Sequence, residues 1–191
     1  MTEPHPAAAA RADRVILLLR GINVGGHRLA MATLRSVLEE AGCTDVVTYI
    51  QSGNAVVTPP SPAPTDLAAT LSEAISAAAG YGVPVVVRTR DEMAAVVDAN
   101  PYPHAGGTQL HVVFMVEAPP AAILESLDLP SFLPEECAVI GRELYMHLPN
   151  GMGQAVLPTA LDKASRKIDR SGVGTSRNWN TVLKMLALAD R

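Results

Sequence analysis

The sequence predicts an α+β protein made of two halves, each with helices packed on one face of an antiparallel sheet. Strand-like and helix-like segments run in the order strand, helix, strand, strand, helix, strand over residues 15–90, and a similar order begins again at residue 110. Short turn signals join neighbouring strands, which is typical of hairpins. Hydrophobic residues make up 48% and charged residues 18% of the 191 residues, which suits a folded core and excludes a disordered chain.

Hydrophobic periodicity places the elements of the first half. Residues 15–19 form an apolar run without helical spacing, which predicts a buried strand. Further strands are expected at residues 46–51, 55–58 and 84–89. Helices are expected at residues 31–41 and 67–78, where apolar residues recur at helical spacing, and a short one at 91–99. The order up to residue 89 is the split βαβ order of a ferredoxin-like plait.

The second half repeats this order less completely. Strands are expected at residues 110–116, 137–140 and 144–148, and helices after Pro119, at 157–168 and at about 178–189. No fourth strand stands out. The predicted fold is therefore a duplicated ferredoxin-like plait with antiparallel sheets and helices on one face. It has a disordered tail (1–13), a first half (14–100), and a second, incomplete half that includes the C-terminal helix (101–191).

The two cysteines indicate a reducing environment. Cys43 and Cys137 match no redox or zinc spacing, so both are expected to be reduced. No run of 18 apolar residues exists, and the first residues lack the features of a signal peptide. We therefore expect a cytoplasmic protein without a membrane partner. The histidines are scattered, so the sequence predicts neither a metal site nor a cofactor.

Charge is distributed unevenly along the chain. The formal net charge of −4 argues against a general polyanion binder. Residues 1–160 carry 8 basic and 16 acidic side chains, whereas residues 161–191 carry 7 basic and 3 acidic ones. The basic C-terminal segment can meet an external anion such as nucleic acid, or it can pack against the protein's own acidic body. The sequence leaves both interpretations open.

A glycine-rich loop between the first strand and the first helix is the leading candidate for a site. The string G-I-N-V-G-G-H-R (21–28) keeps the glycine spacing of a phosphate loop but lacks its Lys and Ser/Thr, which excludes a nucleoside triphosphatase. Exposed backbone N–H groups and arginines can still bind an anion. The candidate residues here are Arg20, Gly21, Asn23, Gly25, Gly26 and Arg28. The alternative is a tight turn that needs positive φ angles.

Two further polar segments are candidates for the same site. Gln51, Ser52 and Asn54 lie in a hairpin turn; Ser52 lacks the context of a nucleophile. Arg177, Asn178 and Asn180 are expected to begin the last helix, whose buried stripe would hold Trp179, Val182, Leu183 and Leu186. We expect the loop, the turn and this helix start to converge on one polar surface. The alternative is that they only satisfy one another's hydrogen bonds.

Five strings together resemble one bacterial family. They are L-L-R-G-I-N-V-G-G (18–26), Y-I-Q-S-G-N (49–54), N-P-Y-P (100–103), L-H-V-V-F (110–114) and S-R-N-W-N-T (176–181). The family is domain-of-unknown-function 1697, and the resemblance extends from about residue 14 to residue 189. It implies two ferredoxin-like halves in one α+β unit. The family has no established activity, so the resemblance implies no function.

Three functions are compatible with the sequence. The first is a binding module for a phosphate-bearing ligand, either a nucleotide or RNA; the glycine loop and the basic C-terminal segment favour it. The second is a scaffold or homodimeric interaction protein without catalysis. The third is a metal-independent enzyme acting on a small molecule, for which His27 is the one acid–base group near the loop. Whether the protein is an enzyme stays open, and catalytic residues are unknown.

Overall fold

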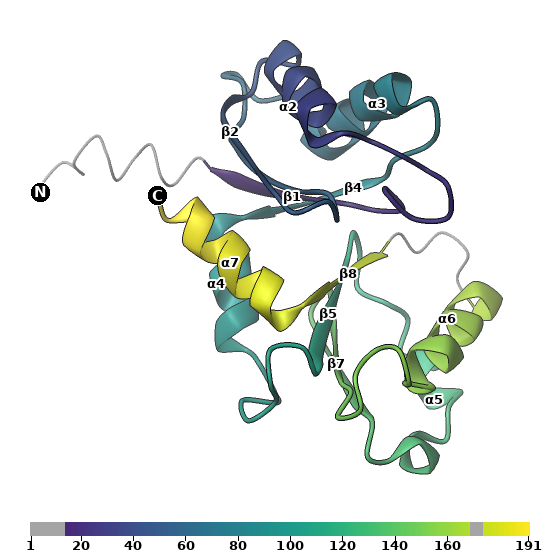
Figure 1. Cartoon of the computed structure of the whole chain (residues 1–191). Coiled ribbons are helices and arrows are strands. Elements are labelled where there is room, and N and C mark those ends of the chain that lie inside the picture. Colours follow the sequence, from purple (N-terminus) through teal and green to yellow (C-terminus); the bar gives the residue numbers. More distant parts are fainter. Residues whose placement is uncertain (1–13, 169–173) are drawn as a thin grey trace, which may run out of the picture. The chain divides into compact units, whose positions relative to one another are not determined.

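The chain folds into two compact units, each built on a four-stranded antiparallel sheet. The computed structural model describes residues 14–168 and 174–191 (Figure 1). The first unit contains the chain up to Ala95 together with Lys184–Arg191, and the second contains Val96–Leu183. The end of the C-terminal helix therefore groups with the first unit, whereas the sequence suggested one division near residue 100. The expected tail, residues 1–13, lies outside the described residues.

The first unit follows the predicted order of elements. Its strands are β1 (Val15–Leu19), β2 (Thr44–Tyr49), β3 (Asn54–Thr58) and β4 (Val85–Thr89), in the spatial order β2-β3-β1-β4. The helices α2 (Met31–Glu40) and α3 (Leu67–Ala79) pack on one face of the sheet, around a core that includes Leu17, Leu34 and Ile75. All five residues of β1 are buried because this strand is central, which explains its unbroken apolar run.

The second unit has the same topology. Its strands are β5 (Leu110–Met115), β6 (Glu136–Ile140), β7 (Glu143–His147) and β8 (Gly174–Asn178), in the order β6-β7-β5-β8. The helices α5 (Ala122–Glu125) and α6 (Leu157–Ile168) contribute Ile123 and Leu161 to its core; a short 3-10 helix spans Leu129–Phe132. In both units, antiparallel neighbours of the central strand and helices on one face agree with the predicted α+β class.

The prediction of an incomplete second half is wrong, because β8 supplies the fourth strand. In β8, Thr175 and Arg177 are buried while Ser176 between them is exposed. The strand therefore has the alternation of a half-buried strand, but its buried positions are polar. A search for apolar residues at every second position cannot detect such a strand.

The last strand of each sheet carries a buried arginine at the same position. Arg88 is the fourth residue of β4 and Arg177 the fourth residue of β8. Each donates a hydrogen bond from Nη1 to the carbonyl of the preceding residue, at 2.9 Å for Arg88 and 2.8 Å for Arg177. A helix follows each strand at once: α4 (Arg90–Asp98) after β4 and α7 (Trp179–Ala189) after β8. This shared feature supports the interpretation that the two units are structural repeats.

Helix α7 differs from its predicted form. It begins at Trp179, so Arg177 and Asn178 belong to β8 and not to the helix. Leu183, which was expected on the buried stripe, is 42% exposed, and the buried side chains of α7 include Val182, Met185 and Leu188. Trp179 itself is half-buried.

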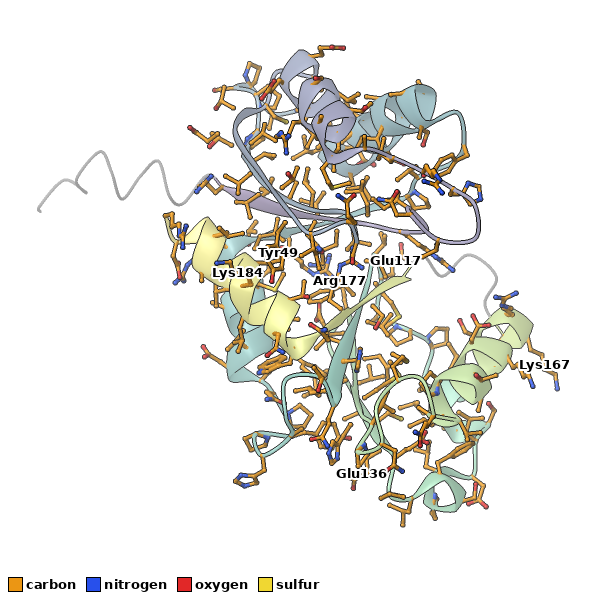
Figure 2. The ribbon with its side chains drawn as sticks, viewed as in Figure 1. Tyr49, Glu117, Glu136, Lys167, Arg177 and Lys184 are labelled. Atoms are coloured by element: carbon orange, nitrogen blue, oxygen red, sulfur yellow. The ribbon has the colours of Figure 1, made fainter. Side chains whose placement is uncertain are left out.

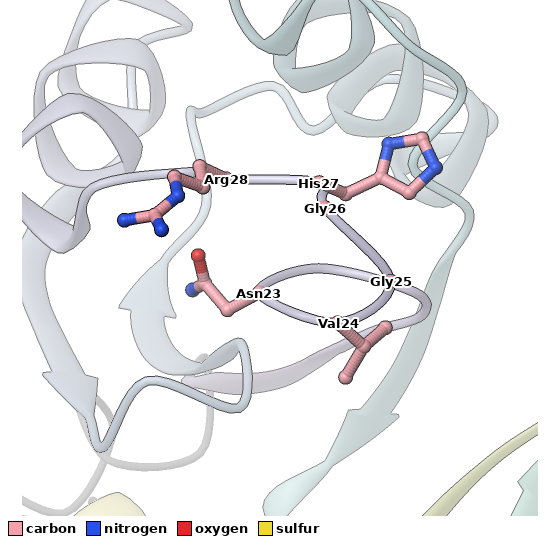
Figure 3. A pocket seen from close by; sticks show the side chains of 6 residues that line it. All are labelled: Asn23, Val24, Gly25, Gly26, His27 and Arg28. Carbon is pink, nitrogen blue, oxygen red and sulfur yellow. The ribbon is translucent and has the colours of Figure 1, made fainter.

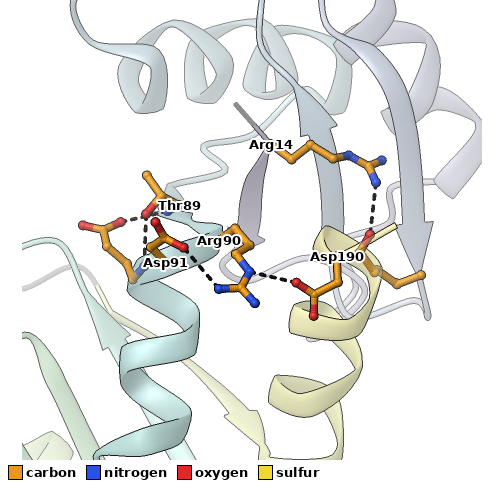
Figure 4. Close-up of polar contacts among 7 residues, drawn as sticks. Arg14, Thr89, Arg90, Asp91 and Asp190 are labelled. Atoms are coloured by element: carbon orange, nitrogen blue, oxygen red, sulfur yellow. Dashed lines mark hydrogen bonds and ion pairs between the residues drawn. The ribbon is translucent and has the colours of Figure 1, made fainter. Parts of the chain in front are cut away.

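Polar contacts hold the end of α7 to the first unit. Arg14 donates from Nη1 to the carbonyl of Leu188 at 3.1 Å, and Arg90 pairs through Nε with Asp190 at 2.8 Å (Figure 4). A guanidinium at the C-terminal carbonyls of a helix is favourable because those carbonyls lack intrahelical partners. These contacts explain why Lys184–Arg191 groups with the first unit.

Both cysteines are free thiols, as predicted. Cys43 lies in the core of the first unit, and Cys137 packs against the core of the second. Burial raises the pKa of both thiols because it disfavours the charged thiolate. Within the described residues, no helix is long and apolar enough to cross a membrane.

Candidate functional site

The connection between β1 and α2 is a long surface loop, residues 20–30. The equivalent connection in the second unit, between β5 and α5, spans only residues 116–121, with the sequence V-E-A-P-P-A. The same topology is thus built there with six residues, no glycine and one acidic side chain. The glycine-rich loop of the first unit is therefore not a requirement of the fold, which favours a functional interpretation over a purely structural one.

Asn23 fixes the shape of this loop. Its side-chain amide donates to the carbonyls of Leu29 at 3.1 Å and Gln51 at 2.8 Å, while its Oδ1 accepts from the N–H of Leu29 at 3.0 Å. Asn23 has a φ of 53°, a conformation that asparagine tolerates better than most residues. These contacts occupy both donors of the amide, so Asn23 shapes the loop and joins it to the turn at Gln51.

The hairpin turn between β2 and β3 lies against the base of the loop. The N–H of Leu19 donates to the carbonyl of Gly53 at 2.8 Å. Asn54 is fully buried and donates from Nδ2 to the carbonyl of Tyr49 at 3.1 Å, which closes the turn. Of the residues predicted for ligand binding, Asn54 thus serves the fold, while Gln51 and Ser52 are exposed. The structure therefore brings together the first two of the three predicted segments.

A pocket of about 300 Å³ is lined by the loop residues (Figure 3). The lining residues are Asn23, Val24, Gly25, Gly26, His27 and Arg28. The backbone N–H groups of Val24, Gly25, Gly26 and Arg28 have no hydrogen-bond partner among the described residues, and all four residues are exposed. Exposed N–H donors in one short loop are the groups that bind phosphate in glycine-rich loops.

The electrostatics around this loop favour an anion. The loop contains two arginines, Arg20 and Arg28, and residues 14–38 contain neither aspartate nor glutamate. Arg28 lines the pocket and, within the part of the chain that the structure describes, forms no hydrogen bond or ion pair. Arg20 is exposed at the start of the loop, and its N–H donates to the carbonyl of Pro84 at 2.9 Å. Arg35 lies outside the pocket and donates to Thr48 Oγ1 at 2.8 Å.

His27 is held at the rim of the pocket by Tyr81. The two ring centroids are 4.1 Å apart with an interplanar angle of 49°. Tyr81 follows Gly80, which ends α3, and its ring packs against the core of the first unit. The Tyr81 hydroxyl is buried without a hydrogen-bond partner among the described residues. Tyr81 is not among the residues predicted from the sequence, because nothing in the pattern after α3 indicates that it reaches His27.

The third predicted segment belongs to the second unit. Arg177 lies on β8 (Figure 2) and donates from Nη1 to Thr175 Oγ1 at 2.6 Å; burial lowers the pKa of its guanidinium to about 10. Asn178 Oδ1 accepts from the N–H of Thr181 at 2.9 Å and so caps α7. The N–H of Asn180 donates to the carbonyl of Gly107 at 3.3 Å. Each residue has a local structural role, and the convergence of all three segments stays a prediction.

The basic C-terminal segment includes an exposed row on α6. Lys163, Arg166 and Lys167 are exposed, and Lys167 projects away from the helix (Figure 2). Arg166 pairs with Asp162 one turn earlier, through Nε and Oδ2 at 2.9 Å. Exposed pairs of this kind contribute little to stability. This row is a second cationic surface, formed by side chains of one helix.

No metal centre can be assigned among residues 14–168 and 174–191. No group of three or more His, Cys, Asp or Glu side chains is placed there to hold a metal ion. His147 lies 3.4 Å from Glu136 through Nδ1, but both belong to the second unit and not to the loop. The arrangement around the glycine loop provides donors and positive charge, which suits binding of an anion.

The fold and the loop define a small two-unit α+β protein with a surface pocket lined by a glycine-rich loop. Residues 13–145 match the family described as protein of unknown function (DUF1697), and the chain belongs to this family. It is similar in fold to the conserved bacterial protein SP0830 from Streptococcus pneumoniae, with a TM-score of 0.66 and 22% sequence identity, covering 94% of this chain and 99% of that one. No curated protein matches the chain.

Proposed function

We propose that the glycine loop binds a phosphate-bearing ligand and that the protein acts as a binding module. The observation that carries this proposal is the set of exposed N–H groups at Val24, Gly25, Gly26 and Arg28 in one pocket, which have no partner among the residues that the structure describes. Backbone N–H groups and an arginine are the donors that form strong, charge-assisted hydrogen bonds to phosphate oxygens. The absence of carboxylates from residues 14–38 supports the same sign of ligand charge.

Each unit is proposed to be a ferredoxin-like plait. The strand order β2-β3-β1-β4, repeated as β6-β7-β5-β8, supports this assignment.

The proposed ligand is a small molecule and not RNA. A volume of about 300 Å³ is at the lower end of the range for small-molecule pockets. RNA-binding plaits use several aromatic rings on the sheet as stacking platforms. Aromatic residues are only 4% of this chain, which favours a small ligand over RNA.

Substitution of Arg28 by alanine tests this function. We expect Arg28→Ala to weaken binding of ribose 5-phosphate by roughly 10- to 150-fold, because a hydrogen bond to a charged group contributes about 1.5–3 kcal/mol. Arg35→Ala is the matched control, since it removes the same charge from the same unit but outside the pocket. Isothermal titration calorimetry measures both. Equal affinities of the two variants and the wild type would contradict the proposal.

A further inference from the structure

We infer that the ligand is a nucleotide, with its phosphate on the glycine loop and its base stacked on His27. This inference rests on the proposed function, because it assumes that the loop binds the phosphate. It adds the second half of the ligand, a flat aromatic group, and it assigns His27 as the residue that selects for it.

The position of His27 follows from its neighbours in the chain. It comes directly after Gly26, so its ring is one residue away from the N–H donors that would hold the phosphate. In Figure 3 the side chains of His27 and Arg28 extend from opposite sides of the loop. A ligand held on the N–H groups of the loop can therefore place its phosphate toward Arg28 and its other end toward His27. Nucleotides have this extended form, with a sugar between phosphate and base.

Tyr81 holds the His27 ring in place before a ligand binds. The Tyr81 ring is held by the core of the first unit and contacts the histidine ring at a centroid distance of 4.1 Å. His27 nevertheless remains exposed, which leaves ring surface available to a ligand. A ring that is already positioned loses less conformational freedom on binding, so more of the stacking energy appears as affinity. The contact between the Tyr81 and His27 rings is thus an observation independent of the N–H groups that are proposed to bind the phosphate.

The lining of the pocket favours a base over a second sugar as the part of the ligand that lies beside His27. Recognition of a sugar needs side-chain hydrogen-bonding groups, and both amide donors of Asn23 are occupied within the loop. The other side chains beside the glycines are Val24, which is 60% exposed, and the His27 ring. An aliphatic and a planar side chain fit the faces of a heterocycle, because every base has a π-face on which rings stack.

The test compares three probes that share a phosphate: inorganic phosphate, ribose 5-phosphate and AMP. AMP and ribose 5-phosphate differ at the group in question, the base. We expect wild-type protein to bind AMP roughly 5- to 150-fold more tightly than ribose 5-phosphate, the range of base–aromatic stacking. In His27→Gln this preference should disappear while the affinity for inorganic phosphate is unchanged. His27→Phe, which keeps a ring, should retain it.

Variants of Tyr81 test whether its ring contact with His27 contributes to binding of the base. Tyr81→Phe keeps the ring and removes only the hydroxyl, so it should preserve the AMP preference; Tyr81→Ala should reduce it. If all phosphate probes bind with equal affinity and His27→Gln changes nothing, the nucleotide inference is wrong and the phosphate site stands. If none of the probes binds to the wild-type protein, both proposals are wrong.

Discussion

Substitution of Gly53 by alanine is expected to lower the free energy of unfolding by about 2–5 kcal/mol. Gly53 has a φ of 74°, and a Cβ atom there would lie 2.7 Å from both Leu19 Cβ and Ile22 Cδ1. Alanine pays a steric cost of about 1–2 kcal/mol in the left-handed region, and overpacking adds about 1–3 kcal/mol. Because Gly53 accepts from Leu19 at the base of the loop, the change should also disturb the pocket.

Substitutions at two other glycines distinguish the cost of the positive φ from the cost of close packing. Gly80 has a φ of 77° but open space around its Cβ position, so Gly80→Ala should lower stability by only about 1–2 kcal/mol. Gly82 has neither a positive φ nor a close neighbour, and Gly82→Ala should change stability by less than about 0.5 kcal/mol. Urea denaturation followed by circular dichroism measures all three. Equal losses for Gly53→Ala and Gly80→Ala would show that the close packing is not important.

Replacement of Glu135 by alanine is expected to lower the free energy of unfolding by about 2–3 kcal/mol. The buried carboxylate of Glu135 accepts from the N–H of Val156 at 3.0 Å and from the N–H of Leu157 at 2.7 Å, at the start of α6. It therefore satisfies backbone donors that have no intrahelical partner, and its negative charge is favourable at a helix N-terminus. Alanine leaves these donors without their acceptor.

The neighbouring Glu136 is the matched control. Its side chain is 49% exposed and contacts His147 through a single 3.4 Å pair. Glu136→Ala should change stability by less than about 0.5 kcal/mol, as for other exposed ion pairs. Thermal unfolding of both variants checks this contrast. A loss for Glu136→Ala as large as for Glu135→Ala would contradict the assigned role of Glu135.

The sequence predicts elements well where burial and hydrophobicity coincide. The strand β1 and the helix α6 were both expected within one residue of their observed ends, because their buried positions are apolar. The strand β8 was missed because Thr175 and Arg177 occupy its buried positions. For the same reason, the start of α7 was placed too early. Polar residues that are buried through tertiary contacts have no signature in local hydrophobicity.

The candidate site was only partly predictable. The composition of the loop identified the glycines and Arg28, because exposed N–H groups and charge depend on local sequence. It did not reveal that Asn23 and Asn54 form hydrogen bonds within the protein, or that Tyr81 supports His27. The contacts of Asn23 with Gln51 and of His27 with Tyr81 join residues that are far apart in the chain, and a single sequence records no trace of them. The contact of Asn54 with Tyr49 is local, but it depends on the exact geometry of the turn.

Backbone amide shifts during a phosphate titration test the proposed function most directly. In two-dimensional ¹H–¹⁵N spectra, ribose 5-phosphate should cause saturable shifts at Gly25, Gly26 and Arg28, and Arg28→Ala should weaken them strongly. This result is expected because these N–H groups are exposed and lack partners among the described residues. Shifts confined to Lys163 and Lys167 on α6, or no saturable shift at the glycines, would contradict the proposal that the loop is the phosphate site.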